Sequence, residues 1–199
     1  MENELKEFIN FKKNYNFKQL DIVLKDGNLY CKDLLLKDEH GYVGETEEWV
    51  NVSYSLRGMY TKLLSNLFPY EFTFKGHTLN SIECFFQGIK FKDKNLQTKL
   101  FRYSGKEATV LQKATDYNWK ETGIIYWQGK PIKRDSKEYD ELVDELYISA
   151  IQNEFYRNAI KNCNLPIIHA IGVEDKKETV FTRYEFEFML NCLHDFLNR

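Results

Sequence analysis

Hydrophobic residues recur along the chain with two different periods, and the alternating period predicts two pairs of strands. In the segment IVLKDGNLYCKDLLL, Asp26 and Gly27 stand between two alternating apolar runs. An Asp-Gly dipeptide in that position is a strong signal for a β-hairpin. A second extended pair is expected where YEFTF turns at Lys75-Gly76 into HTLN.

Helical spacing dominates after the second pair of strands. Ser81 stands where an N-cap residue belongs, directly ahead of the segment IECFFQGIKF, which we expect to be a helix. Further helices are expected at residues 96–103 and 106–116. Residues 117–134 hold two Trp, two Gly and one Pro, and this composition predicts a loop with a short strand.

The C-terminal third predicts two well-marked helices around a buried strand. Asp135 with Glu138 forms a capping box, and apolar residues then recur at helical spacing towards Cys163. The apolar segment PIIHAIGV predicts a buried strand. Thr182 with Glu185 forms a second capping box ahead of the last helix. One face of that helix carries Phe186, Met189, Leu190, Leu193 and Leu197. The whole pattern predicts a helix-rich α+β domain with a few short strands.

Composition favours one folded domain. The chain has 199 residues, 43% of them hydrophobic, and only three prolines and ten glycines that could form a flexible linker. This apolar content excludes a disordered chain, and a mean hydropathy of −0.55 without a long apolar run excludes a membrane protein. The first ten residues, MENELKEFIN, lack the basic start and apolar stretch of a targeting segment.

The charge balance limits the kinds of partner that the chain can bind, and the cysteines indicate the redox compartment. The 28 basic and 30 acidic residues leave a formal net charge of −2. This balance argues against a protein that binds the phosphate backbone in general, although it allows a local basic patch. The four cysteines lie far apart and form no CxxC pair. We therefore expect free thiols, a cytoplasmic location, and neither a disulfide nor a zinc site.

The densest group of candidate functional residues lies in the helix predicted after Ser81. Its apolar side chains fall on one arc, whereas Glu83, Gln87 and Lys90 form a separate narrow polar stripe. Glu83 and Lys90 are about 10 Å apart along the helix axis, because each residue adds ~1.5 Å. They could flank a ligand that lies along the stripe. A solvent-exposed face of an amphipathic helix explains the same spacing.

Other polar residues are expected near the start of this helix. Arg57, Ser65 and Asn66 precede it, and a helix N-terminus beside such donors attracts anions. Only six of the 28 basic residues are arginines. The planar guanidinium suits phosphate or carboxylate, so we consider Arg57 and Arg134 for ligand binding.

Residues 64–91, LSNLFPYEFTFKGHTLNSIECFFQGIKF, resemble the signature of the NADAR (NAD and ADP-ribose), or YbiA-like, superfamily. That signature runs LSNFYP…F…G…(P/S)S-E-H-(Y/F)-x-Q-A-x-K-F. Its Ser-Asn pair, Glu, Gln and Lys match this chain at the same spacing. The matching residues are Ser65, Asn66, Glu83, Gln87 and Lys90.

The resemblance continues more weakly to the C-terminus. Arg134 stands ahead of a long predicted helix, and LYISAIQNEFYRNAI is similar to the family helix ALRAKFxQNxxLxxxL. The resemblance implies a NADAR-like catalytic domain at residues 51–199, of the helix-rich YbiA-like type. Residues 1–50 would then form an N-terminal extension that contains the first β-hairpin.

The chain also departs from the family pattern. The family's His after Glu is Cys84 here, and its Ala after Gln is Gly88. The glycine-rich stretch WGxGxxGxNxLG of YbiA-type members is absent, and IIHAIGV and ETVFTRYEF stand in its place. The chain therefore resembles a divergent member, and the substrate preference of YbiA-type enzymes does not transfer to it.

The resemblance implies N-glycosidic chemistry. Some members cleave the ribosyl C–N bond of early riboflavin-pathway intermediates, and others remove ADP-ribose from guanine bases. For this chain we expect an N-glycosidase or ADP-ribosyl hydrolase that removes ADP-ribose from guanine in nucleic acid or nucleotides. Three alternatives stay open: a non-catalytic module that binds ADP-ribose or a nucleotide, an N-glycosidase of riboflavin-pathway intermediates, and a protein-interaction domain.

Two residues are candidates for the chemistry that the resemblance implies. Breaking a C–N glycosidic bond needs a proton for the departing base, and the Glu83 carboxyl can supply it. A lysine with a lowered pKa can trap the open-chain C1 aldehyde as a Schiff base, and Lys90 is the candidate. No cofactor and no metal ion are expected to take part.

Ligand binding is assigned to residues around this pair. Arg57, Ser65 and Asn66 would hold phosphates or ribose hydroxyls, together with Gln87 on the stripe. Trp127 is the preferred ring for stacking on the base, and Trp119 is the second choice.

Arg134 would fix the diphosphate or hold the segment with the two tryptophans, and a surface charge at a helix start is an equal alternative. Cys84 with His77 could form a thiol–imidazole pair, but Cys84 has the position of a buried thiol. His169 stands in an apolar strand and is expected to be a core histidine. The expected partner is the ADP-ribosylated substrate, without a membrane, and the oligomeric state stays open.

Overall fold

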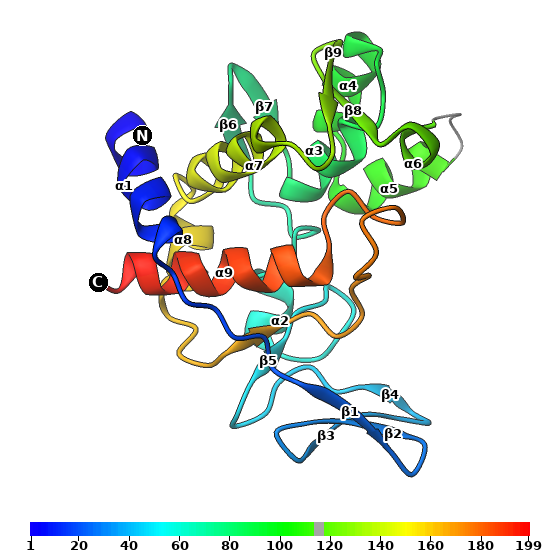
Figure 1. Ribbon diagram of the computed structural model, residues 1–199, viewed down its shortest axis with the longest axis vertical. Coiled ribbons are helices and arrows are strands. Elements are labelled where there is room, and N and C mark those ends of the chain that lie inside the picture. Colours follow the sequence, from blue (N-terminus) through cyan, green and yellow to red (C-terminus); the bar gives the residue numbers. More distant parts are fainter. Residues whose placement is uncertain (114–117) are drawn as a thin grey trace.

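The computed structural model describes residues 1–113 and 118–199, and it confirms the α+β class that the sequence predicts (Figure 1). The helices are α1 (Glu2–Lys13), α2 (Met59–Leu63), α3 (Ile82–Gly88), α4 (Lys94–Phe101), α5 (Gly105–Lys113), α6 (Trp119–Thr122), α7 (Lys137–Ala150), α8 (Glu154–Lys161) and α9 (Arg183–Leu197). The strands are β1 (Ile22–Lys25), β2 (Asn28–Cys31), β3 (Leu34–Asp38), β4 (Gly41–Tyr42), β5 (Val50–Asn51), β6 (Phe72–Phe74), β7 (His77–Leu79), β8 (Ile124–Trp127), β9 (Lys130–Lys133) and β10 (Ile167–Ile168).

The N-terminal strands form a small antiparallel sheet in the order β1-β2-β3-β4, which lies at the bottom of Figure 1. The predicted hairpin is confirmed, because Lys25 pairs with Asn28 across Asp26 and Gly27. Both turn residues have positive φ, 51° and 80°, as a two-residue hairpin turn requires. A small cluster of buried side chains joins this sheet to the rest of the chain: Cys31, Leu36, Trp49 and Ile168.

The main core lies between the helices. In Figure 1, α9 crosses the middle of the molecule, with α7 and α3 above it and α1 beside its C-terminal end. The two ends of the chain meet there, because the rings of Phe8 and Phe196 pack edge to face with centroids 5.3 Å apart. The first helix therefore belongs to the same core as the last one.

The hairpin predicted at Lys75-Gly76 is confirmed as β6 and β7. The prediction of a loop with a short strand at residues 117–134 is wrong for the residues that the structure describes, because α6 precedes a full hairpin, β8–β9. Its turn is Gln128-Gly129, with φ of 48° and 84°, a dipeptide that gives no strong turn signal in the sequence. The last residues of the helix predicted at 106–116 lie outside the described part of the chain.

The prediction of one helix that begins at Asp135 and continues towards Cys163 is wrong at two points. The N-cap is Ser136, whose side chain accepts a hydrogen bond from the amide of Tyr139, so no capping box forms with Asp135. The helix ends at Ala150, and Asn153 caps a separate helix, α8, through two backbone amides. A side-chain cap competes with continued helix at Asn153, and the cap prevails.

The second capping box is confirmed, because Thr182 and Glu185 bond each other's backbone at the start of α9. The buried strand predicted in PIIHAIGV is only two residues long, β10, and it pairs in parallel with β5.

The helix after Ser81 is shorter than predicted. It ends at Gly88, so Lys90 lies in the turn that follows. Within the described residues, no helix is long and apolar enough to cross a membrane.

Candidate functional site

A cavity of about 310 Å³ lies between α3 and the segment that leads into α9. One side, which we call the α3 wall, consists of α3 and the loop before β6. The opposite side, which we call the His169 wall, consists of residues 169–186 together with Val52. The lining residues are Val52, Ser65, Asn66, Leu67, Glu83, Phe86, Gln87, Lys90, His169, Ile171, Gly172, Val173, Thr179, Val180, Phe181 and Phe186.

The start of α3 is tied to the Ser65–Asn66 loop. Ser81 caps the helix by accepting from the amide of Cys84, and the amide of Glu83 donates to the carbonyl of Asn66 at 2.8 Å. The hydroxyl of Tyr147 donates to the side-chain oxygen of Asn66 at 2.9 Å. These bonds hold the loop against the helix, so that both contribute to one wall of the cavity.

Three of the predicted site residues form a continuous chain of hydrogen bonds on the α3 wall. The Gln87 amide nitrogen donates to a carboxylate oxygen of Glu83. The Lys90 ammonium donates to the Gln87 amide oxygen at 2.7 Å. Gln87 thus links the carboxylate to the ammonium, and the turn after α3 brings Lys90 back towards Glu83. The Lys90 nitrogen also lies 5.9 Å from the centroid of the Trp119 ring.

Burial disfavours the charged forms of both ionisable groups on this wall. It raises the pKa of Glu83, while the hydrogen bond from Gln87 and the charge of Lys90 act in the opposite direction. It lowers the pKa of Lys90 to about 8, against the opposing effect of the Glu83 carboxylate. The wall therefore carries a carboxyl group that retains its proton more readily than usual and an amine that loses its proton more readily than usual.

His169 is hydrogen-bonded within the protein, as expected of a core histidine, but its side chain also lines the cavity. Its Nδ1 bonds the carbonyl oxygen of Val52 at 2.7 Å, and its ring packs on Phe186 with centroids 4.6 Å apart. Burial lowers the pKa of this imidazole. No local pattern marks this residue as a site residue, because the partner of Nδ1 is 117 positions away in the sequence.

The structure brings together Ser65, Asn66, Glu83, Gln87 and Lys90, but it places other candidates elsewhere. Arg57 is exposed and does not line the cavity. Trp127 is partly buried and packs against the core beside Phe74, Phe85 and Phe101. Trp119 is 2% exposed and is not a lining residue of the cavity, although its ring lies near Lys90.

Arg134 is 3% exposed and has a structural partner. Its guanidinium forms a two-pronged ion pair with Glu185, the carboxylate of the α9 capping box, and one of the two contacts measures 3.0 Å. The guanidinium carbon Cζ of Arg134 lies 4.4 Å from the centroid of the Tyr139 ring. Arg134 therefore connects the start of α7 to the start of α9, and it is neither a surface charge nor a lining residue of the cavity.

The thiol–imidazole pair does not form. Cys84 is fully buried, its sulfur donates to the carbonyl oxygen of Tyr103 at 2.7 Å, and burial raises its pKa to about 11. His77 instead packs edge to face on Phe101 and Trp127. Among the described residues, no group of three or more His, Cys, Asp or Glu side chains is arranged to hold a metal ion.

Comparison with known proteins identifies the family. Residues 58–195 match the family described as bacteriophage protein GP30.3. A protein of Enterobacteria phage T4, described as an uncharacterized 17.1 kDa protein in the Gp30-rIII intergenic region, is 33% identical over 138 residues, which are 67% of this chain and 90% of that protein. The chain therefore belongs to the GP30.3 family.

A solved structure is similar in part. The NMR structure of the E. coli protein YbiA aligns with a TM-score of 0.48 and 14% sequence identity, over 77% of this chain and 86% of that chain. Membership of the NADAR superfamily itself remains a prediction from the motif at residues 64–91.

Proposed function

We propose that this member of the GP30.3 family is an N-glycosidase that cleaves the bond between C1 of a ribose and the nitrogen of a base. The substrate we propose is guanine carrying ADP-ribose, in nucleic acid or in a nucleotide. The observation that carries the proposal is the Glu83–Gln87–Lys90 chain, in which a carboxyl group and an amine with shifted pKa values line one cavity.

Glu83 would supply the proton for the departing base. A base leaves a ribose carbon more easily when its nitrogen is protonated as the bond breaks. The raised pKa of Glu83 favours the protonated carboxyl that such a step needs. The Gln87 amide, which bonds the same carboxyl, would keep it oriented towards the cavity.

Lys90 would act as the nucleophile. The ribose ring opens as the C1–O4 bond breaks and the ring oxygen takes up a proton, which turns the bond between C1 and the base nitrogen into a C=N bond. The neutral amine of Lys90 then adds to C1, Glu83 gives its proton to the base nitrogen, and the bond from C1 to the base breaks. A C=N bond now joins C1 to Lys90, and the proton lost by the amine returns to Glu83. Water then hydrolyses this bond, which releases the sugar aldehyde and restores the amine. A pKa of about 8 supports this role, because an appreciable fraction of the amine is neutral near pH 7.

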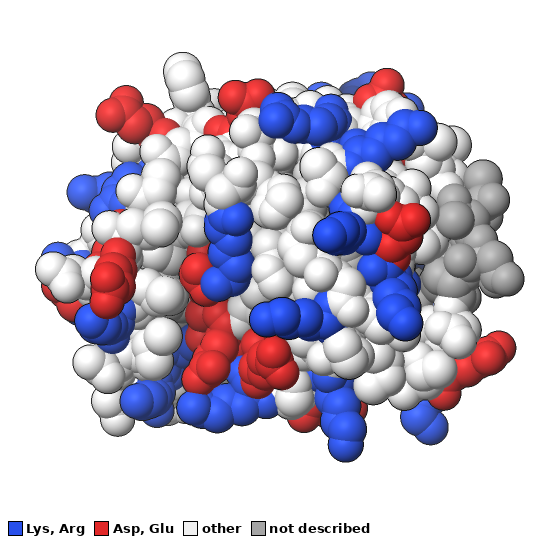
Figure 2. All heavy atoms as spheres, turned by 90° about the horizontal axis from the view of Figure 1, so that it is seen from above, with Lys and Arg blue, Asp and Glu red and all other residues white. Residues whose placement is uncertain are grey.

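Size and charge support a single modified nucleotide as the ligand. The cavity of about 310 Å³ falls at the lower end of the range for small-molecule sites. On the face shown in Figure 2, Lys and Arg side chains are spread with Asp and Glu side chains among them. With a net charge of −2, such a surface suits the binding of one nucleotide better than that of a long phosphate backbone.

The test is incubation of the full chain with guanine-ADP-ribosylated DNA, RNA and guanosine nucleotide, followed by product analysis by mass spectrometry. We expect release of free ADP-ribose and unmodified guanine from at least one substrate. Riboflavin-pathway ribosylamines in the same assay test the alternative leaving group. Absence of product from every substrate would contradict the proposal.

A second candidate function is a module that binds ADP-ribose without cleaving it. The observation that favours it is the pair of hydrogen bonds that Gln87 forms with Glu83 and Lys90. These bonds occupy groups that a hydrolase would need for the reaction. Calorimetry with ADP-ribose, run beside the product analysis, separates the two functions. Tight binding without turnover on any substrate would favour the module.

A further inference from the structure

The imidazole of His169 has one nitrogen engaged by the protein. The Val52 carbonyl oxygen can only accept a hydrogen bond, so at 2.7 Å it must receive the proton of Nδ1. Nε2 is then the nitrogen that remains for a ligand, and the side chain lines the cavity. In the neutral ring, which burial favours, Nε2 carries a lone pair and accepts a hydrogen bond.

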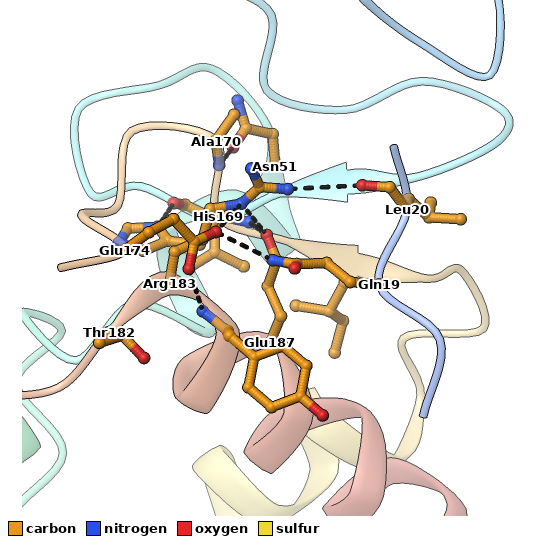
Figure 3. A network of polar contacts seen from close by, with 12 residues as sticks. Gln19, Leu20, Asn51, His169, Ala170, Glu174, Thr182, Arg183 and Glu187 are labelled. Atoms are coloured by element: carbon orange, nitrogen blue, oxygen red, sulfur yellow. Dashed lines mark hydrogen bonds and ion pairs between the residues drawn. The ribbon is translucent and has the colours of Figure 1, made fainter. Parts of the chain in front are cut away.

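The backbone of His169 is held by a buried carboxylate. Glu187 is 0% exposed and accepts three hydrogen bonds of 2.7 Å, from the His169 amide, from Arg183 and from the side chain of Gln19. Figure 3 shows these groups converging at the start of α9. Next to them, the Asn51 side-chain oxygen accepts from the amide of Ala170 at 2.9 Å. Both the backbone and the ring of His169 are therefore fixed in position.

The residues that fix His169 come from two parts of the sequence. Arg183 and Glu187 lie within the region that matches the GP30.3 family, which begins at residue 58. Gln19, Asn51 and Val52 precede that region. The N-terminal segment thus supplies side chains and a carbonyl that complete the His169 wall.

We infer that His169 contacts the ligand and that its Nε2 accepts a hydrogen bond from a ribose hydroxyl. A lone pair attracts a hydrogen-bond donor, whereas phosphate oxygens are acceptors and would be repelled. The donors of an ADP-ribosyl ligand are the ribose hydroxyls and the adenine amino group, and the hydroxyls are the donors that lie next to C1, where the proposed reaction takes place. This inference rests on the proposed function, and it makes the His169 wall a determinant of sugar recognition opposite Glu83 and Lys90.

Two substitutions separate this role from a purely structural one. In His169→Asn, the amide nitrogen takes the place of Nδ1 and keeps the bond to Val52, but nothing replaces Nε2. In His169→Gln, the amide oxygen reaches the position of Nε2, but the bond to Val52 is lost. We expect ADP-ribose affinity to fall about tenfold in His169→Asn and to stay within about threefold in His169→Gln, because a neutral hydrogen bond contributes on this scale.

The outcomes are read by calorimetry with ADP-ribose, and the fold of each variant is checked by thermal denaturation. If His169 only stabilises the fold, the order reverses: His169→Asn binds like the unaltered chain and His169→Gln is weakened. That reversal would overturn the inference while leaving the proposed function intact. Binding without turnover in the unaltered chain would contradict the proposed hydrolysis, but the affinities would still test His169. If the unaltered chain binds no ADP-ribose, the proposed function fails and this inference fails with it.

A measurement on the unaltered chain tests the same inference without a variant. Nitrogen-15 NMR of the histidine rings distinguishes a protonated from an unprotonated ring nitrogen. We expect His169 to carry its proton on Nδ1 and the Nε2 signal to shift when ADP-ribose is added. A proton on Nε2 in the free protein would contradict the inference.

Discussion

The two walls of the cavity are assembled in different ways. On the α3 wall, the hydrogen bonds that join the functional groups connect residues four and three positions apart, Glu83 to Gln87 and Gln87 to Lys90. On the His169 wall, the bond to Val52 spans 117 positions and the bond between Gln19 and Glu187 spans 168. The chain of functional groups on the first wall arises from residues close together in the sequence, whereas the contacts that hold His169 exist only in the complete fold.

This difference explains which site residues a sequence pattern can identify and which it misses. Glu83 and Gln87 share a face because of helical spacing, and Lys90 follows in the next turn, so a sequence pattern can identify all three. His169 has an apolar sequence context, IIHAIG, and its function as a lining residue depends on distant contacts. The following predictions test whether the α3 wall carries the chemistry and the His169 wall depends on long-range support.

The largest effect is expected on the α3 wall, from removal of the Lys90 amine. Lys90→Ala should lower the turnover of ADP-ribosylated guanosine about a thousandfold, or about 4 kcal/mol of transition-state stabilisation, because no nucleophile remains. Lys90→Arg retains a cation but cannot form a C=N bond, so it should be equally inactive. Single-turnover kinetics provide the measurement.

Lys92→Ala is the matched control, because Lys92 is exposed and lies two positions further along the chain. It should keep the turnover of the unaltered chain. Activity of Lys90→Arg close to that of the unaltered chain would exclude the Schiff base, and a charge role for Lys90 would then have to be considered.

The next effect concerns the support of the His169 wall. Glu187→Ala should lower the free energy of unfolding by about 3 kcal/mol, because it leaves Arg183 and the His169 amide buried without their acceptor. Urea denaturation followed by circular dichroism measures the change.

Glu174 offers a matched control for Glu187. It also pairs with Arg183, at 3.7 Å, but its side chain is 52% exposed. Glu174→Ala should therefore change the free energy of unfolding by less than about 0.5 kcal/mol. Equal losses in the two variants would mean that burial of the Glu187 network contributes nothing specific.

Below pH 8, the reactivity of the Lys90 amine is expected to rise about tenfold with each pH unit. Its pKa is lowered to about 8, and only the neutral amine attacks an aldehyde. Trapping of ribose 5-phosphate on Lys90 by cyanoborohydride should therefore rise with pH up to about 8 and then level off. An ordinary lysine amine would keep gaining reactivity well beyond that pH.

Replacement of Glu83 sharpens this test. The carboxylate raises the pKa of Lys90, so Glu83→Gln should move the trapping curve to lower pH. Mass spectrometry of the Lys90 peptide follows the adduct in both proteins. A curve that moves to higher pH, or does not move, would contradict the coupling between the two groups.

The smallest effect is expected from the N-terminal segment. Gln19→Ala removes the 2.7 Å hydrogen bond that the Gln19 side chain donates to Glu187. This loss should lower the free energy of unfolding by about 1 kcal/mol. Lys18→Ala alters the neighbouring exposed residue and should change stability little. If the two variants unfold at the same urea concentration, the contact between Gln19 and Glu187 does not support the His169 wall.

Much of the local structure could be predicted from the sequence, because short-range chemistry decides it. The hairpin at Asp26-Gly27, the cap at Ser81 and the capping box at Thr182 all appear as expected. Predictions fail where two local signals compete and where a turn carries no typical sequence. Asn153 sits in a helical pattern but caps a new helix, and Gln128-Gly129 forms a hairpin turn without a typical turn sequence.

The same division applies to the candidate site residues. The guanidinium of Arg134 suits phosphate, yet its partner is the Glu185 carboxylate, 51 positions away. The ring of Trp127 is of the type that stacks on a base, yet it is partly buried and stacks on Phe101. Residue type alone cannot distinguish a ligand from a partner within the protein, because both satisfy the same side-chain chemistry.

The sequence by itself determined the α+β class, several helix starts and the polar stripe of Glu83 and Gln87, because caps, turns and helical spacing act over a few residues. Only the tertiary structure decided that Lys90 turns back beyond the end of α3 and that His169 faces the same cavity. The physical reason is that burial and long-range hydrogen bonds set these positions. Both arise only when segments from opposite ends of the chain pack together.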